Sequence, residues 1–179
     1  RPPTPRPPLP PTPHFLSRHA PLSGATTTTI NSNGVPLTST GLPGTNTIGT
    51  LSTGGTSTST VAIHAASNLT TGAYTSASKY ITVDGAATSV SFGSTAIAGG
   101  VVTSIDASGM TAGGVTVVLP TATTVFKGGA GTDIVTTAGA TLGATAVIDG
   151  GAGSSDRLVL ANSTDMATAT EAAKYINFE

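Results

Sequence analysis

A repeat with a period near 22 residues constrains the fold of this chain more than any other feature of its sequence. Residues 81–85, 103–107, 124–128 and 146–150 share a pattern in which β-forming residues precede a charged residue and then a small one. The charged positions 84, 106, 127 and 149 lie 22, 21 and 22 residues apart. A fixed period of this length is typical of stacked coils, so we expect a solenoid, with residues 61–65 as an earlier coil.

Each period also carries a second apolar cluster, at residues 90–92, 115–119, 134–135 and 158–160. Two strands in each coil, joined by glycine-rich turns, would bury their apolar side chains only against neighbouring coils. Crossovers between parallel strands are right-handed in nearly all proteins. The sequence therefore predicts an all-β fold, a right-handed parallel β-roll or β-solenoid with coils of about 22 residues.

Two glycine-rich loops lie one period apart. Residues 128–136 read Gly-Gly-Ala-Gly-Thr-Asp-Ile-Val-Thr, which fits the nonapeptide G-G-x-G-x-D-x-U-x, where U is a large apolar residue. Residues 150–159 form an imperfect copy, in which Ser154-Ser155 places one extra residue before Asp156. Because Gly128 and Gly150 are 22 residues apart, we expect the two loops to lie side by side in adjacent coils.

The residue types in these loops suit calcium, which takes six to eight hard oxygen ligands. Glycine allows turns that aim backbone carbonyl groups at one point, and aspartate adds a carboxylate. We expect Asp133 to form the firm half of a site and Asp156 the less certain half, with Ile134 pointing inward. The predicted metal-site residues are Gly128, Ala130, Gly131, Asp133, Asp149, Gly150, Ala152, Gly153 and Asp156. Glycine-rich turns without a metal remain the alternative.

Segment 103–160 resembles the hemolysin-type (RTX) calcium-binding repeats, and the wider chain is similar to bacterial RTX surface-layer and adhesin-like proteins. The shared features are the Thr/Ala/Gly/Ser bias, the absence of cysteine, and a closing Ile176-Asn177-Phe178-Glu179 segment. The resemblance implies secretion by a type I system, calcium-triggered folding outside the cell, and a structural or adhesive role.

Composition excludes several other functions. Charged residues make up 8% of the 179 residues, and from residue 19 onward four Lys/Arg face eight Asp/Glu, so a nucleic-acid partner is not expected. No window approaches 18 continuous apolar residues, so no transmembrane helix is expected. The three histidines show no metal-ligand spacing, and neither H-E-x-x-H nor G-x-S-x-G occurs. We therefore do not expect an enzyme.

The chain divides into three predicted regions. Residues 1–23 are a proline-rich extended segment, either a stiff spacer or a ligand for a proline-recognising groove. Residues 24–60 are Thr/Ser/Gly-rich and irregular or built of short strands, and residues 61–179 are the calcium-binding β-solenoid. Near its end, residues 163–175 predict one short helix capped by Ser163 or Thr164. Residues 176–179 look like the opening of a further strand, so we expect the solenoid to be truncated there.

The predicted function is structural: a self-associating component of a secreted bacterial surface layer or other extracellular assembly, forming a lattice or filament with Ca²⁺ as cofactor. The alternative is an adhesin stalk or binding segment that recognises a surface polysaccharide or another glycan. The two differ in a measurable way. A lattice protein assembles with itself in calcium, whereas an adhesin segment stays monomeric and binds a ligand.

Overall fold

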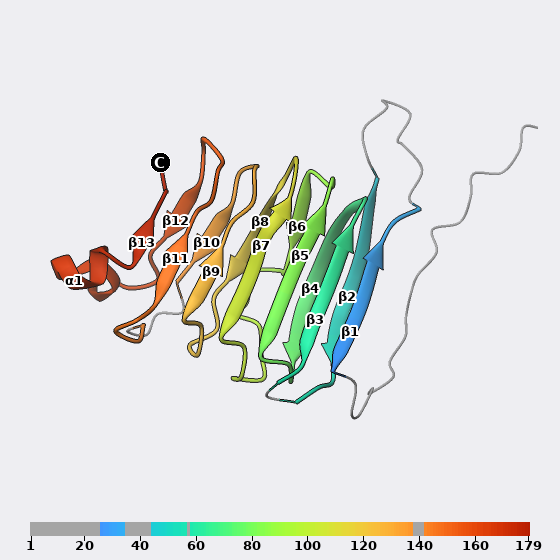
Figure 1. The fold of residues 1–179 in the computed structure, drawn as a ribbon, viewed down its shortest axis with the longest axis horizontal. Coiled ribbons are helices and arrows are strands. Elements are labelled where there is room, and N and C mark those ends of the chain that lie inside the picture. Colours follow the sequence, from blue (N-terminus) through green and yellow to red (C-terminus); the bar gives the residue numbers. More distant parts are fainter. Residues whose placement is uncertain (1–25, 35–43, 57, 138–141) are drawn as a thin grey trace, which may run out of the picture.

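A computed structural model describes residues 26–34, 44–56, 58–137 and 142–179, which form a parallel β-solenoid of about six turns with coils of about 23 residues (Figure 1). Its strands form two sheets. The odd sheet contains β1 (Thr27–Ser32), β3 (Thr60–Ala65), β5 (Tyr80–Gly85), β7 (Ser104–Met110), β9 (Val125–Lys127), β11 (Val147–Asp149) and β13 (Tyr175–Ile176). The even sheet contains β2 (Thr45–Thr53), β4 (Asn68–Ser76), β6 (Ser89–Ser91), β8 (Gly114–Val118), β10 (Ile134–Thr136) and β12 (Arg157–Val159). The predicted fold class is confirmed.

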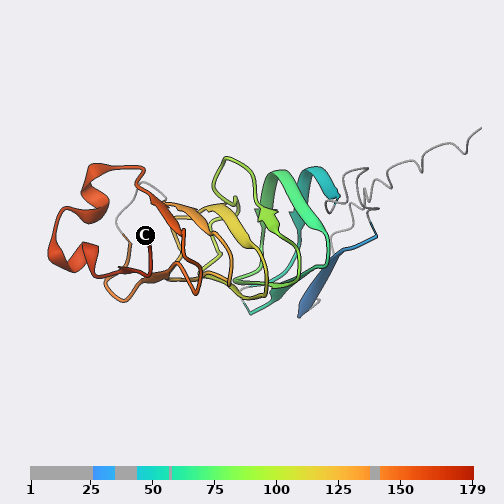
Figure 2. The ribbon, with the colours of Figure 1, turned by 90° about the horizontal axis from the view of Figure 1, so that it is seen from above.

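The core lies between the two sheets, where equivalent side chains stack from coil to coil. In the odd sheet Ile105 pairs with Phe126, and Phe126 pairs with Ile148. In the even sheet Val117 pairs with Val135. All five side chains are fully buried, because successive residues of a strand face opposite sides of its sheet. Figure 2 shows the sheets as the two long walls of a flattened coil, with the helical turns at the C-terminal end.

The register corrects one part of the predicted repeat. Asp106, Lys127 and Asp149 share one row across neighbouring strands, as the sequence predicts. Asp84 does not belong to this row, because Thr82 pairs with Asp106 and the register then shifts. A bulge between β5 and β7 lets the chain gain residues without losing the stack of buried side chains.

Residues 24–60 do contain the expected short strands, and these strands continue the solenoid. β1 pairs with β3, and β2 pairs with β4, both in parallel. The inward positions at this end carry hydroxyl groups, among them Ser32 and Thr53, which are buried. Oγ1 of Thr53 lies 3.2 Å from the hydroxyl of Tyr74, so these polar groups satisfy one another inside the coil. The proline-rich residues 1–23 lie outside the described residues.

The predicted helix at residues 163–175 is instead two short pieces, a 3-10 helix η1 (Ser163–Met166) and an α-helix α1 (Ala169–Ala172). Their caps are Asn162 and Thr168, so the predicted cap at 163–164 is wrong. The Thr168 hydroxyl accepts the N–H of Glu171 at 3.1 Å, which starts a new helix after the first has ended. β13 then forms where the sequence predicts the opening of a strand.

Candidate functional site

The two glycine-rich loops lie side by side in adjacent coils, as the sequence predicts. The N–H of Ala152 donates to the carbonyl oxygen of Gly129 at 2.9 Å. At the start of the loops, the N–H of Gly128 donates to the carbonyl of Asp149 at 2.8 Å. The loops are thus joined by the same kind of backbone hydrogen bond that joins neighbouring strands.

Glycine is required in these loops because the coils approach one another closely. A Cβ atom at Gly128 would collide with the carbonyl oxygen of Gly150. Gly151 has a φ of +104°, and a Cβ there would lie 2.6 Å from the carbonyl oxygen of Gly129. A Cβ at Gly153 would lie 2.7 Å from Oδ1 of Asp156, so this glycine makes room for a carboxylate.

Asp133 points into the solenoid, where its side chain is fully buried. Its Oδ1 accepts the N–H of Val115 at 2.7 Å, and its Oδ2 accepts the N–H of Gly129 at 2.9 Å. Burial raises the pKa of Asp133 to about 6; the two backbone hydrogen bonds oppose this shift and the charge of Asp156 adds to it. Both oxygens of Asp133 thus accept backbone N–H groups and shape the loop, at the residue predicted as the firm half of a calcium site.

Asp156 occupies the equivalent position one coil later. The pairing of Ile134 with Arg157 keeps the two aspartates in register, so the loop absorbs the extra residue at 154–155. Oδ1 of Asp156 accepts the N–H of Asp133 at 2.8 Å, whereas its buried Oδ2 has no hydrogen-bond partner. The pKa of Asp156 is raised, first by burial and then by the charges of Glu179 and Asp149, against the backbone hydrogen bond from Asp133.

Glu179 repeats the arrangement a third time, and the sequence prediction missed it. Its Oε2 accepts the N–H of Asp156 at 2.9 Å, and its own N–H donates to the carbonyl of Asp156 at 3.0 Å. We call Asp133, Asp156 and Glu179 the carboxylate ladder, since each accepts a backbone N–H from the preceding coil. A spacing of 23 residues between successive members is the signal that could have identified Glu179.

The remaining predicted site residues surround the ladder without joining it. Oδ1 of Asp149 accepts the N–H of Gly151 at 3.0 Å and Nδ2 of Asn177 at 2.8 Å. The N–H of Ala130 donates to a carbonyl of the preceding coil, that of Met110, at 3.0 Å. The N–H of Gly131 makes a similar bond, 3.2 Å long, to the carbonyl of Gly113.

The inward position of the nonapeptide also differs from the prediction. Val135 is fully buried, and Ile134 is only half-buried on the outer face. Since side chains alternate along a strand, the inward Asp133 places Val135 inward and Ile134 outward.

The geometry fits a cation at Asp156 better than at Asp133. Within the described residues, no group of three or more His, Asp or Glu side chains is gathered closely enough to hold a metal ion. A site would therefore combine a carboxylate with backbone carbonyl oxygens, a donor set that calcium accepts. Among the described residues, two buried carboxylate oxygens have no hydrogen-bond partner, Oδ2 of Asp156 and Oδ1 of Asp165. Only Oδ2 of Asp156 belongs to the glycine-rich loops, near the charges of Asp149 and Glu179, so it is the loop atom with unused capacity for such an ion.

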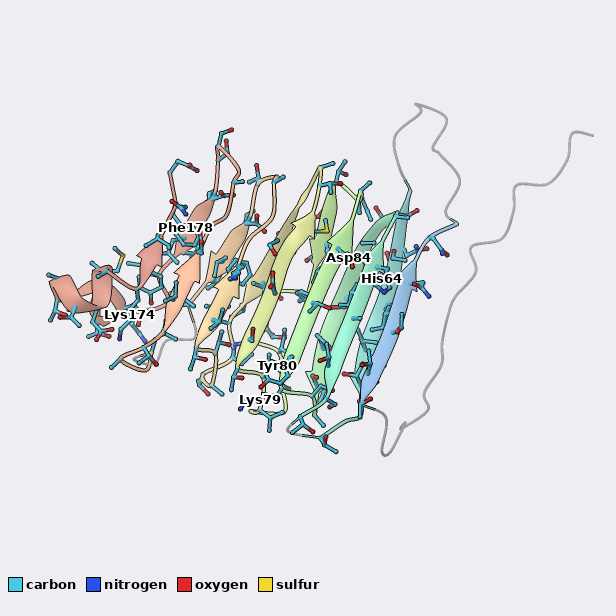
Figure 3. All side chains as sticks on the ribbon, in the orientation of Figure 1. His64, Lys79, Tyr80, Asp84, Lys174 and Phe178 are labelled. Carbon is cyan, nitrogen blue, oxygen red and sulfur yellow. The ribbon has the colours of Figure 1, made fainter. Side chains whose placement is uncertain are left out.

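His64 is the histidine that lies in the described part of the chain. It is exposed on the outer face of the odd sheet, and its Nδ1 lies 2.7 Å from Oδ1 of Asp84 on the neighbouring strand (Figure 3). His14 and His19 lie outside the described residues. The His64–Asp84 contact is a surface pair of the kind that contributes little to stability.

No family model, no curated protein and no solved structure matches this chain. In the part of the chain that the structure describes, no helix is long and apolar enough to span a membrane.

Proposed function

We propose that the protein is a structural element of a secreted bacterial surface layer or a similar extracellular assembly, folded and stapled by calcium and associating with copies of itself. One observation carries the calcium part of this proposal: a fully buried carboxylate oxygen, Oδ2 of Asp156, without a partner. A buried charge without a partner is costly, and a bound cation removes that cost. The resemblance of the loops to RTX repeats supports the same ion.

Calcium would be held by Asp156 together with Glu179 and carbonyl oxygens of the stacked loops. Bound there, it would supply positive charge and would add a link between two coils that already meet through stacked side chains and backbone hydrogen bonds. Asp133 has a different task in this proposal. It shapes the first loop by holding the N–H groups of Val115 and Gly129.

Calcium would couple folding to location. The loops come together only in the folded chain, so an ion that binds them stabilises the folded state alone. A chain that meets little calcium inside the cell and millimolar calcium outside would remain unfolded during export and fold on arrival. A solenoid suits this scheme because its stability is close to a sum over neighbouring coils.

The test combines spectroscopy and microscopy on the full chain. We expect circular dichroism to show a stronger β-signal and a higher melting temperature in millimolar calcium than in EGTA, with magnesium as the control ion. Electron microscopy of the calcium-loaded protein should show sheets or filaments. An unchanged melting temperature would exclude the calcium staple, and monodisperse particles at every concentration would exclude self-association.

The outer face of the even sheet supports the adhesin alternative. Thr47, Thr70, Ser91 and Thr116 occupy one row across neighbouring strands. Hydroxyl groups both donate and accept hydrogen bonds, as a polysaccharide ligand requires. Under this alternative the calcium-loaded chain stays monomeric and binds a glycan. A glycan array and a sedimentation experiment on the same sample therefore distinguish the two functions.

A further inference from the structure

The outer face of the odd sheet carries two rows of side chains near its C-terminal end. In the first row, Val125 on β9 lies next to Val147 on β11. In the second row, Lys127 on β9 lies next to Asp149 on β11, and Asp149 lies next to Ile176 on β13. A cation, an anion and apolar side chains are thus arranged side by side on three strands.

Lys127 forms no ion pair with either carboxylate of its row. Oδ1 of Asp106 accepts the N–H and the hydroxyl of Ser108, at 3.0 and 2.6 Å. Oδ1 of Asp149 is turned toward Gly151 and Asn177. Among the other cations of the described chain, Lys174 pairs with a carboxylate, whereas Lys127 presents an unpaired charge to the exterior.

The apolar members of these rows are among the most exposed large side chains of the described residues. Val147 is 45% exposed and Ile176 is 42% exposed. Apolar side chains that adjoin one another on the outer face of a sheet and are rimmed by polar residues form a candidate contact surface for another molecule. Together with the free cation of Lys127, they define a small face centred between β9 and β11.

We propose that a second copy of this chain covers this face, packed sheet to sheet about a two-fold axis that runs parallel to the strands between β9 and β11. Such an axis places β9 of one copy over β11 of the other. Lys127 then faces Asp149 of the second copy, and Val125 faces its Val147. At these two central strands both rows are complementary under the same operation, as an isologous interface requires.

The alternative axis, between β7 and β9, fits less well. It also brings Lys127 opposite a carboxylate, that of Asp106. In the first row, however, it would place Ser104 against Val125, because these two residues are neighbours in that row. Packed sheets rotate by about 30° relative to each other, so matching is strictest at the two central strands. The β9–β11 axis satisfies both rows there.

This inference rests on the proposed self-association and names the surface that performs it. Sedimentation of the full chain in millimolar calcium, across a range of concentrations, should show a monomer–dimer equilibrium or larger species. We expect Lys127→Glu, which faces a like charge, to weaken association by about tenfold or more. Val147→Arg should act in the same direction. Val101→Arg is the matched control, because Val101 is 38% exposed and lies outside the sheets.

Cysteine crosslinking tests the axis itself, since the chain contains no native cysteine. Sheet faces pack about 10 Å apart, so a short bis-maleimide spans them where a disulfide would not. A mixture of Val125→Cys and Val147→Cys proteins should crosslink into a heterodimer faster than either variant alone. Preferential crosslinking of Val125→Cys with Ser104→Cys would overturn the proposed axis.

The outcomes separate this inference from the proposed function. If Lys127→Glu and Val147→Arg associate as strongly as the Val101→Arg control, this face is not the interface, although the protein self-associates. If the wild-type chain remains monomeric in calcium at every concentration, both this inference and the proposed self-association are wrong. Circular dichroism of each variant establishes that the fold is retained.

Discussion

Replacing Asp156 by asparagine should have opposite effects on stability with and without calcium. Asparagine retains a carbonyl oxygen that can accept the N–H of Asp133, now held by Oδ1 at 2.8 Å. It removes a buried negative charge that has an unpartnered oxygen and lies near Asp149 and Glu179. The metal-free protein should therefore become more stable, whereas the calcium-loaded protein should lose a ligand.

The expected size follows from general magnitudes. A buried charge without a partner costs several kcal/mol, whereas the neutral amide NH2 that would replace Oδ2 costs about 1–3 kcal/mol. The difference should stabilise the metal-free Asp156→Asn chain by about 2 kcal/mol. For a chain of this size that is about 4–8 °C in melting temperature. Calcium at about 100 times its dissociation constant stabilises the wild-type protein by about 2.7 kcal/mol, which the variant should not gain.

The assay is thermal unfolding at pH 8, where Asp156 is more fully ionised, in calcium-free and calcium-containing buffer. Asp106→Asn is the matched control, since its side-chain oxygen can keep the contacts with Ser108 and it lies outside the loops. A lower melting temperature of Asp156→Asn without calcium would refute the argument about the buried charge. A calcium-induced shift as large as that of the wild type would show that Asp156 is not a ligand.

Three further predictions concern pH, the loops and the core. The pKa of Asp133 is raised to about 6 in the folded state, so the protonated side chain stabilises the folded protein fully below about pH 4, and this stabilisation is lost as the pH rises through 6. The loss is at most about 3 kcal/mol and smaller where solvent screens the carboxylate. A free energy of urea unfolding that stays flat or rises between about pH 4 and 6 in metal-free buffer would contradict this prediction. Gly128→Ala should lower the urea midpoint strongly because its Cβ meets the carbonyl of Gly150, while Gly143→Ala, with no atom within 4 Å of the added Cβ, should have almost no effect. Phe126→Ala should destabilise the protein by about 3–5 kcal/mol, and a loss below about 1 kcal/mol in denaturant unfolding would mean that the coils do not stack around this ring.

The sequence predicted the solenoid where buried positions are apolar. In residues 24–60 it predicted irregular structure or short strands without assigning them to the solenoid. The stack of Ile105, Phe126 and Ile148 follows directly from the 22-residue period. In β1 and β2 the most deeply buried positions are Ser32 and Thr53, so no apolar alternation assigned these short strands to the solenoid. Hydroxyl groups that bond to one another inside the coil serve the same purpose, but their pattern resembles that of a polar loop.

The stacking of the two glycine loops was predicted, whereas the hydrogen bonds of their carboxylates were not. The stacking of the two glycine loops follows from their spacing, as the bond between Ala152 and Gly129 shows. Both aspartates accept an N–H from the preceding coil, so the bond within the loop decides which carboxylate oxygen stays free. Gly129, four residues before Asp133, occupies its Oδ2, whereas Oδ2 of Asp156 has no such partner. The contact with Val115 spans 18 residues, so no local pattern contains it.

The carboxylate ladder favours a fixed order in which the turns of the solenoid fold. The N–H of Val115 is capped by Asp133, that of Asp133 by Asp156, and that of Asp156 by Glu179. The capped N–H of each turn is therefore hydrogen-bonded only after the following turn has folded, and it stays exposed to water until then. In a chain that emerges with its N-terminus first, the turns would fold in order along the sequence, and each turn would be held by the carboxylate of the following one. Local unfolding would start at the turn that folds last. Among the three capped N–H groups, hydrogen exchange should therefore be fastest at Asp156 and slowest at Val115.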